Sequence, residues 1–93
     1  MSVAVILNPV SGGGTGQRVR RELERGLAKR GVGCTVHETA GPGDALRLAQ
    51  QLASAGAERI VAAGGDGTVH DVANGILRSH HATTLGVLPI GTG

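Results

Sequence analysis

The chain has 93 residues, 40% of them hydrophobic, and contains no Phe, Tyr or Trp. This length allows one small domain, whose core must be built from Val, Leu, Ile and Ala. The formal net charge of +2 excludes a strongly basic nucleic-acid-binding protein and gives no argument for an anionic membrane. A membrane-spanning helix needs about 20 apolar residues. The first apolar run is far shorter, and we expect neither a membrane span nor a signal peptide.

Two local features refine this picture. Six basic residues fall between Arg18 and Arg30, with Glu22 and Glu24 among them. Such a run is typical of the solvated face of a helix, and a surface that contacts anionic lipid headgroups is the alternative interpretation. The single cysteine, Cys34, permits no internal disulfide, and its apolar neighbours predict a small buried residue, as in a cytoplasmic protein.

The first apolar run, residues 3–7, precedes a turn signal and predicts a buried parallel strand. A Gly-rich loop follows over residues 8–16. Residues 17–30 predict a helix, because apolar residues recur every four positions between charged ones, and Gly31 can end it. These apolar residues are Val19, Leu23 and Leu27.

A second strand is predicted over residues 34–39, before a break at 41–43. Asp44 is expected to cap a helix over residues 45–55. The side chains that this helix should bury are those of Leu48, Ala49 and Leu52.

A third strand is predicted over residues 59–63, a third helix over 69–77, and a fourth strand over 84–88. Thr68 and Asp71 have the spacing of a capping box at the start of the helix, although Asp stands where Glu is usual. The expected core positions of this helix are Val69, Val72, Ala73, Ile76 and Leu77.

The alternation of strands and helices predicts an α/β fold with three layers, α/β/α, and a parallel sheet. In such folds ligands bind beyond the carboxyl ends of the strands, near a switch point. Three predicted strands end in Gly-rich loops, and the other ends at Thr39, just before Gly41. Because these loops share one edge of the sheet, they predict a phosphate-bearing ligand there.

The first Gly-rich loop, residues 8–16, fits neither of two common phosphate motifs. A Walker A loop requires a Lys that is missing here, and Gln17 stands where its second Gly should be. Gln17 also breaks the G-x-G-x-x-G dinucleotide fingerprint. By itself this loop is as compatible with a plain tight turn as with a phosphate site.

The second loop, Gly-Gly-Asp-Gly-Thr at residues 64–68, also follows a strand and opens a helix. Its glycines let the backbone approach a ligand, and Thr68 can offer its hydroxyl. Asp66 has two interpretations. Its carboxylate can interact favourably with the helix dipole at the N-terminus of the helix. If the surrounding backbone amides bind a phosphate, the Asp66 carboxylate would repel that phosphate unless a metal or a ribose hydroxyl lay between them.

Three segments together resemble the diacylglycerol kinase catalytic domain family, which includes bacterial lipid kinases, sphingosine kinases and ceramide kinases. The resemblance covers essentially the whole chain and implies the N-terminal fold that NAD kinases share. The segments are Asn-Pro-x-Ser-Gly after the first strand, Gly-Gly-Asp-Gly-Thr with a following Val-Ala-Asn-Gly-Ile-Leu, and the final Leu-Gly-Val-Leu-Pro-Ile-Gly-Thr-Gly.

This resemblance implies transfer of the ATP γ-phosphoryl group to a lipid hydroxyl with Mg²⁺, which relies on positioning and charge neutralisation. It also implies a catalytic role for Asp66 and supplies no metal ligands from this chain. The residues expected to bind ATP are Asn8, Ser11, Gly12, Thr39, Gly64, Gly65, Asp66, Gly67, Thr68, Val69, His70 and Thr92.

The family pattern also predicts what this sequence lacks. His70 and Asp71 stand where Asn and Glu are frequent, which is tolerable. The chain stops inside a glycine turn, where the family continues with Asn-Asp-Phe and a β-rich second domain. That domain supplies metal-binding carboxylates, the general base and much of the lipid pocket. Residues 1–93 are therefore expected to be the ATP-binding portion of a truncated catalytic domain, inactive alone.

The expected partners are ATP, a lipid, a membrane surface contacted transiently by the full-length protein, and a second copy in a homodimer. Nucleic acid is not expected, and the protein should be cytoplasmic and peripheral to the membrane. Two alternatives stay open: an NAD kinase-like enzyme and a non-catalytic nucleotide-binding module. His37, His80 and His81 have no Cys or carboxylate partners at metal-ligand spacing, so no metal site is predicted.

Overall fold

The computed structural model describes residues 2–9 and 16–89 of the chain. Strands and helices alternate, and every strand pairing within these residues is parallel, as the sequence predicts. The elements are β1 (Ser2–Leu7), α1 (Gly16–Lys29), β2 (Gly33–Glu38), α2 (Asp44–Ser54), β3 (Arg59–Gly64), α3 (Asp66–Ser79) and β4 (Thr84–Pro89).

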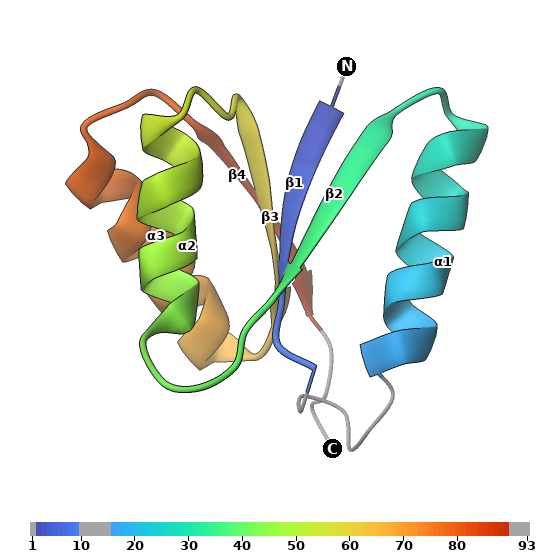
Figure 1. Cartoon of the computed structure of the whole chain (residues 1–93), viewed down its shortest axis with the longest axis horizontal. Coiled ribbons are helices and arrows are strands. Elements are labelled where there is room, and N and C mark those ends of the chain that lie inside the picture. Colours follow the sequence, from blue (N-terminus) through green and yellow to red (C-terminus); the bar gives the residue numbers. More distant parts are fainter. Residues whose placement is uncertain (1, 10–15, 90–93) are drawn as a thin grey trace.

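The strands form one sheet in the order β2-β1-β3-β4. Helix α1 covers one face, and α2 and α3 lie side by side on the other, which gives three layers (Figure 1). Val5 of the central strand pairs with Val36 in β2 and with Val61 in β3. The chain thus leaves β1 toward one side for β2 and returns past β1 for β3, which makes the boundary between β1 and β3 the switch point of the sheet.

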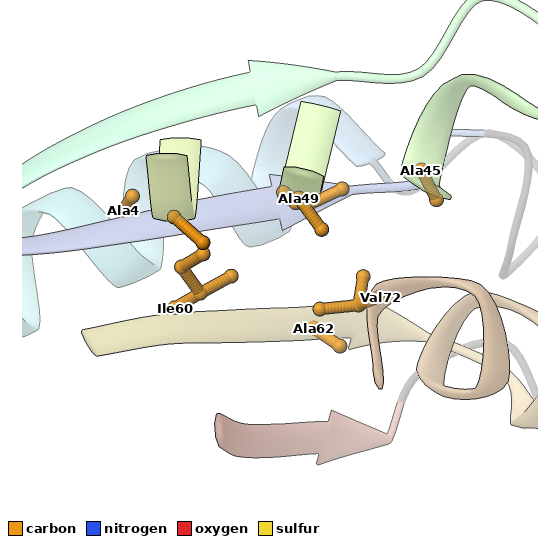
Figure 2. Packing of buried hydrophobic residues seen from close by; sticks show 8 residues of the cluster. Ala4, Ala45, Ala49, Ile60, Ala62 and Val72 are labelled. Atoms are coloured by element: carbon orange, nitrogen blue, oxygen red, sulfur yellow. The ribbon is translucent and has the colours of Figure 1, made fainter. Parts of the chain in front are cut away.

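Strand β1 is buried on both of its faces, as its continuous apolar sequence predicts. Ala4 and Ile6 face the layer of α2 and α3, where they meet Ile60 and Ala62 of β3. Figure 2 shows the small side chains of this cluster, including Ala49 from α2, gathered between helices and sheet. With no aromatic side chain to fill space, this core depends on close approach of the backbones.

The opposite core lies beneath α1. Its buried members come from β1 and β3, and Val19 and Leu23 of the helix pack against them, as their spacing predicts. The Cys34 side chain joins this cluster from β2 but is only half-buried. Within residues 17–29 of α1 no side chain is fully buried, so this layer is held less tightly than the other.

Gly75 permits the closest contact between α2 and α3. A Cβ atom at this position would lie 2.7 Å from the Cβ of Ala49 and closer still to the Leu46 carbonyl oxygen. Because a backbone carbonyl cannot move away as a flexible side chain can, only glycine fits here. The two helices can therefore approach each other at this point more closely than any larger residue would allow.

Four of the six predicted helix boundaries agree with the structure within one residue, and the two ends of α3 do not: residues 69–77 were predicted, and the helix spans Asp66–Ser79. This helix begins at Asp66, after Gly65 in the N-cap position, and no side chain caps it. Thr68, the expected cap, lies inside the first turn and is buried. Asp44 is also no cap in the expected sense, because Gly43 occupies the N-cap position and Asp44 begins α2.

Two further residues of α3 are informative. Leu77 is 71% exposed, so the expectation that it belongs to the core is wrong, whereas Val72 is fully buried. The helix ends at His80 in the left-handed conformation (φ 58°), a position that commonly holds glycine. Among the described residues, no helix is both long enough and apolar enough to cross a membrane.

Candidate functional site

A cavity of about 360 Å³ opens at the carboxyl edge of the sheet. It lies where β1 and β2 end and where α2 and α3 begin, beside the switch point that α/β folds use for ligands. The residues that line it are Asn8, Thr39, Ala40, Gly41, Pro42, Gly43, Ala45, Gly67, Thr68 and Asp71.

Sheet hydrogen bonds bring the first two of these residues together. The backbone N–H of Asn8 donates to the Ala63 carbonyl oxygen at 3.0 Å, and the backbone N–H of Thr39 donates to the Leu7 carbonyl oxygen at 2.9 Å. The pairing between strands thus continues one residue past each strand end. Asn8 and Thr39 are therefore positioned by the rigid sheet, although both precede irregular segments.

Thr68 forms another part of the cavity wall. The Asn8 side-chain Nδ2 atom donates to the Thr68 Oγ1 atom at 3.5 Å, which links β1 to the first turn of α3. Thr68 packs directly over Gly64, where a Cβ atom would lie 2.6 Å from its Oγ1 atom. Only glycine at position 64 leaves room for the Thr68 side chain. Gly64 therefore has a structural role, besides any role in letting the backbone approach a ligand.

The N-terminus of α3 lies at the same end of the sheet. The helix begins after Gly65, whose carbonyl oxygen accepts from the Val69 N–H at 3.2 Å. Within residues 2–9 and 16–89 no side-chain hydrogen bond caps the first turn, so its backbone N–H groups are suited to binding an anion. Cβ atoms at Gly65 and Gly67 would meet nothing within 4 Å, so open space lies beside this turn.

Carboxylates also lie at this end of the molecule. Asp71 lines the cavity, one turn into α3, and Asp66 is exposed at the first residue of that helix. Within residues 2–9 and 16–89 no group of three or more His, Cys, Asp or Glu side chains gathers into a metal-binding cluster. A cation held at this edge would therefore need further oxygen ligands, such as phosphate oxygens.

The structure brings some of the predicted site residues together in the cavity and not others. Asn8, Thr39, Gly67 and Thr68 line it. Gly64, Gly65, Asp66, Val69 and His70 belong to the same turn and helix start but do not line it. Ser11, Gly12 and Thr92 lie outside the described residues.

Val69 and His70 have their own surroundings. The Val69 side chain packs against the core beneath α2 and α3. His70 is exposed, and its carbonyl oxygen accepts from the Asn74 side chain at 3.0 Å. Neither residue lines the cavity.

Sequence reasoning missed most of one wall of the cavity and one acid. The wall is the connection from β2 to α2, residues 39–43, of which only Thr39 is expected at the ligand, and the acid is Asp71. The rule that places ligands beyond strand ends could have included the wall, since Thr39 was already expected there. Asp71 was interpreted only as a capping residue, because its helix was predicted to start later.

Together these features define a doubly wound α/β protein with a ligand cavity at the switch point of its sheet and an uncapped helix N-terminus beside that cavity. Residues 2–93 match the family described as the diacylglycerol kinase catalytic domain. The chain belongs to this family.

Individual relatives agree with this assignment. A diacylglycerol kinase of Bacillus subtilis is 35% identical over 88 residues, which cover 95% of this chain and 29% of the relative. One of Staphylococcus aureus is 36% identical over 91 residues, which cover 95% of this chain and 28% of the relative. The chain thus spans less than a third of the length of these two proteins.

Solved structures give the same result for the fold. The crystal structure of a diacylglycerol kinase from Bacillus anthracis is similar with a TM-score of 0.84 at 30% identity, covering 98% of this chain and 33% of that one. The solution structure of a phosphate-loop protein, 19% identical with a TM-score of 0.63, covers all of this chain and 80% of that one. The latter comparison concerns the fold alone.

Proposed function

We propose that this chain is the ATP-binding portion of a lipid kinase, which in the full-length protein transfers the γ-phosphoryl group of ATP to a lipid hydroxyl. One observation carries the proposal: the Asn8 and Thr68 side chains meet in a cavity beside the uncapped start of α3. Family membership supplies the reaction class. Since such transfer depends on positioning, hydroxyl and backbone N–H groups are the equipment that this portion needs.

The dimensions and surroundings of the cavity suit part of a nucleotide. Its volume of about 360 Å³ falls within the range of small-molecule sites. The open space beside Gly65 and Gly67 would let phosphate oxygens approach the backbone. We propose the following ATP-binding residues, of which Ser11, Gly12 and Thr92 rest on the family motifs alone: Asn8, Ser11, Gly12, Thr39, Gly64, Gly65, Asp66, Gly67, Thr68, Val69, His70 and Thr92.

The acidic residues at this edge support Mg²⁺ as the accompanying ion. Asp66 is exposed in the first turn of α3, and Asp71 lines the cavity. Phosphate groups placed beside these carboxylates would be repelled unless a cation lay between them. Mg²⁺ is commonly held by one or two carboxylates together with substrate phosphates, which fits a role for Asp66. When bound, the ion would neutralise charge on the transferred group.

A phosphorylation assay of the full-length protein tests this function. With radiolabelled ATP and Mg²⁺, we expect label in one member of a panel containing diacylglycerol, sphingosine, ceramide and phosphatidylglycerol. ATP with Mg²⁺ should also raise the melting temperature, because a ligand that binds only the folded state stabilises it. A clear shift with NAD and none with millimolar ATP would contradict the lipid-kinase proposal. Binding of ATP without transfer to any acceptor would favour a non-catalytic module.

Asp66→Ala provides the sharpest variant for this assay. A lost catalytic carboxylate should reduce turnover by at least roughly 100-fold, whereas a lost helix-dipole contact costs only about 0.3–1 kcal/mol of stability. Glu58→Ala is the matched control, because Glu58 is an exposed acid that precedes β3 at the opposite edge of the sheet. Retained turnover in Asp66→Ala, with the fold intact, would reduce Asp66 to a helix-terminus role.

A further inference from the structure

One wall of the cavity is a short connection whose shape depends on a residue outside the cavity. All of residues 39–43, which join β2 to α2, line the cavity. Asp44, the next residue, does not line it. This connection has glycine at position 41 and Gly43 in a left-handed conformation (φ 87°), so Pro42 between them is the main restraint that its own sequence provides.

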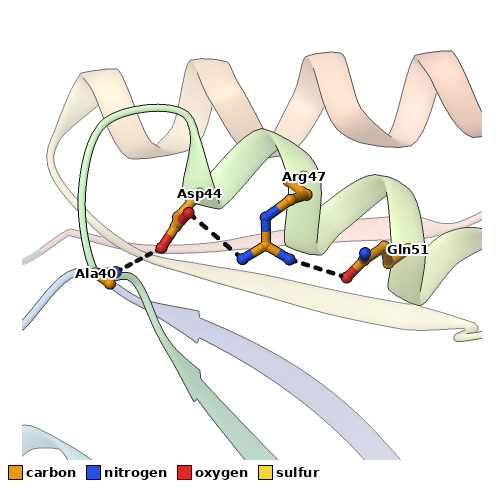
Figure 3. A network of polar contacts seen from close by, with 4 residues as sticks. All are labelled: Ala40, Asp44, Arg47 and Gln51. Carbon is orange, nitrogen blue, oxygen red and sulfur yellow. Dashed lines mark hydrogen bonds and ion pairs between the residues drawn. The ribbon is translucent and has the colours of Figure 1, made fainter.

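Asp44 makes two hydrogen bonds with the connection, of which Figure 3 shows the one to Ala40. Its Oδ2 atom accepts from the Ala40 backbone N–H at 2.7 Å. Its own backbone N–H donates to the Gly41 carbonyl oxygen at 3.2 Å. The wall is therefore tied at two successive residues to the start of α2.

The carboxylate is itself held in place. The Arg47 Nη2 atom donates to the Asp44 Oδ1 atom at 3.4 Å, and the Arg47 Nη1 atom donates to the Gln51 Oε1 atom at 3.3 Å. These three side chains form a row along α2 that ends at the wall. The oxygen that meets Ala40 is thus supported from a regular helix.

We infer that Asp44 is a positioning residue for the ligand in this cavity, acting through the shape of the 39–43 wall. A simple helix cap is a poorer explanation, because the carboxylate accepts from Ala40, which precedes the helix, and no side chain caps α2. The identity of the ligand rests on the proposed function, whereas the link from Asp44 to the wall does not. Without the Asp44 bond the wall would be looser and would have to become ordered when the ligand binds. Loss of this bond should therefore weaken ligand affinity.

The test compares Asp44→Ala, Asp44→Asn and Arg47→Ala in the full-length protein, with ATP and Mg²⁺ as the probe. The matched control is Glu58→Ala, which removes an exposed acid at the opposite edge of the sheet. We expect the Kd and KM for ATP to rise roughly three- to tenfold in Asp44→Ala with kcat little changed. Asp44→Asn keeps a hydrogen-bond acceptor of the same size, so its Kd and KM for ATP should lie between those of the wild type and of Asp44→Ala. Arg47→Ala keeps the Ala40 bond but removes the support of the carboxylate, so its Kd for ATP should also lie between those of the wild type and Asp44→Ala. Glu58→Ala should resemble the wild type.

Hydrogen exchange at the Ala40 amide provides a second readout. This amide should exchange roughly tenfold faster in Asp44→Ala than in the wild type, as expected for the loss of a charge-assisted hydrogen bond. Unchanged exchange, or unchanged ATP affinity despite faster exchange, would overturn the inference. If Asp44→Ala does not fold, Asp44→Asn decides by the same criteria. If the wild type does not bind ATP, the proposed function fails, and exchange at the wall alone then decides whether Asp44 holds it.

Discussion

Cys34 illustrates how partial burial controls one reactive group. Its side chain packs beneath α1 against the cluster formed by Val3, Val5 and Leu7. Burial raises the pKa of the Cys34 thiol above its ordinary value, the Glu24 carboxylate adds to the rise, and Arg20 opposes it. The folded protein therefore favours the neutral thiol, the unreactive form.

We predict that iodoacetamide alkylates Cys34 at least about fivefold more slowly in the folded protein than in urea at mildly alkaline pH. The raised pKa also has a consequence for stability. Its contribution is fully present below the thiol pKa of the unfolded chain and is lost as the pH rises from there through the folded value. Equal alkylation rates in the two states would contradict the prediction.

Individual site residues were predictable where a strand or a motif fixed them. Asn8 and Thr39 follow directly from the ends of apolar strands, and both line the cavity. Thr68 lies at the carboxyl edge of the sheet, as its place after β3 predicts, but its burial over Gly64 depends on a distance between two backbone segments that no local pattern contains. The bond from Asp44 to Ala40 was missed for a different reason. It spans only four residues, but the sequence favours Asp44 as an N-cap of α2 and does not indicate a bond to the preceding connection.

Gly75 gives a prediction for the pairing of α2 and α3. Gly75→Ala should destabilise the protein by about 1–2 kcal/mol, because overpacking costs about 1–3 kcal/mol and better helix propensity returns up to about 1 kcal/mol. The clash involves the Leu46 carbonyl oxygen and the Ala49 Cβ atom, which cannot move independently of α2. Urea unfolding monitored by circular dichroism would measure the change.

Gly26→Ala is the matched control for this prediction. Gly26 lies inside α1 and is exposed, and a Cβ atom there would meet nothing within 4 Å. The substitution should therefore stabilise the protein by roughly 0.5–1 kcal/mol through helix propensity alone. A stabilising Gly75→Ala variant would show that the two helices do not approach as closely as described.

The elements themselves were largely predictable, because each carries its own periodicity. The largest discrepancy, the start of α3, has a clear physical cause. Sequence rules look for a side chain that caps the first turn, and here Gly65 takes the N-cap position while Asp66 and Gly67 are already helical. A helix that opens with such residues does not contain the usual start signal.

The molecule as a whole should be unevenly stable. Residues 17–29 of α1 include no fully buried side chain, whereas α2 and α3 pack on a core that contains Ala49, Ala53 and Val72 at 0% exposure. We predict that backbone amides in α1 exchange with deuterium faster than those in α2 and α3, with β1 slowest. Mass-spectrometric exchange with peptide resolution would measure this order. Uniform protection of the three helices would contradict it.

At this scale the fold class followed from the alternation of elements, but the order β2-β1-β3-β4 did not. That order depends on which strands pair. Val5 pairs with Val36 in β2 and with Val61 in β3, which are 31 and 56 residues further along the chain. Such long-range choices depend on packing between layers rather than on local sequence.

The bond between Asn8 and Thr68 joins residues 60 positions apart, and the cavity needs segments from both ends of that interval. During synthesis, therefore, the cavity cannot exist until the ribosome has released the first turns of α3 and β3 has inserted beside β1. A nascent chain that has completed only its first two strands has no site to fill. Occupancy of this cavity would thus report that β3 has joined β1 and that the first turns of α3 have formed, and a bound ligand would stabilise only chains that have completed this step.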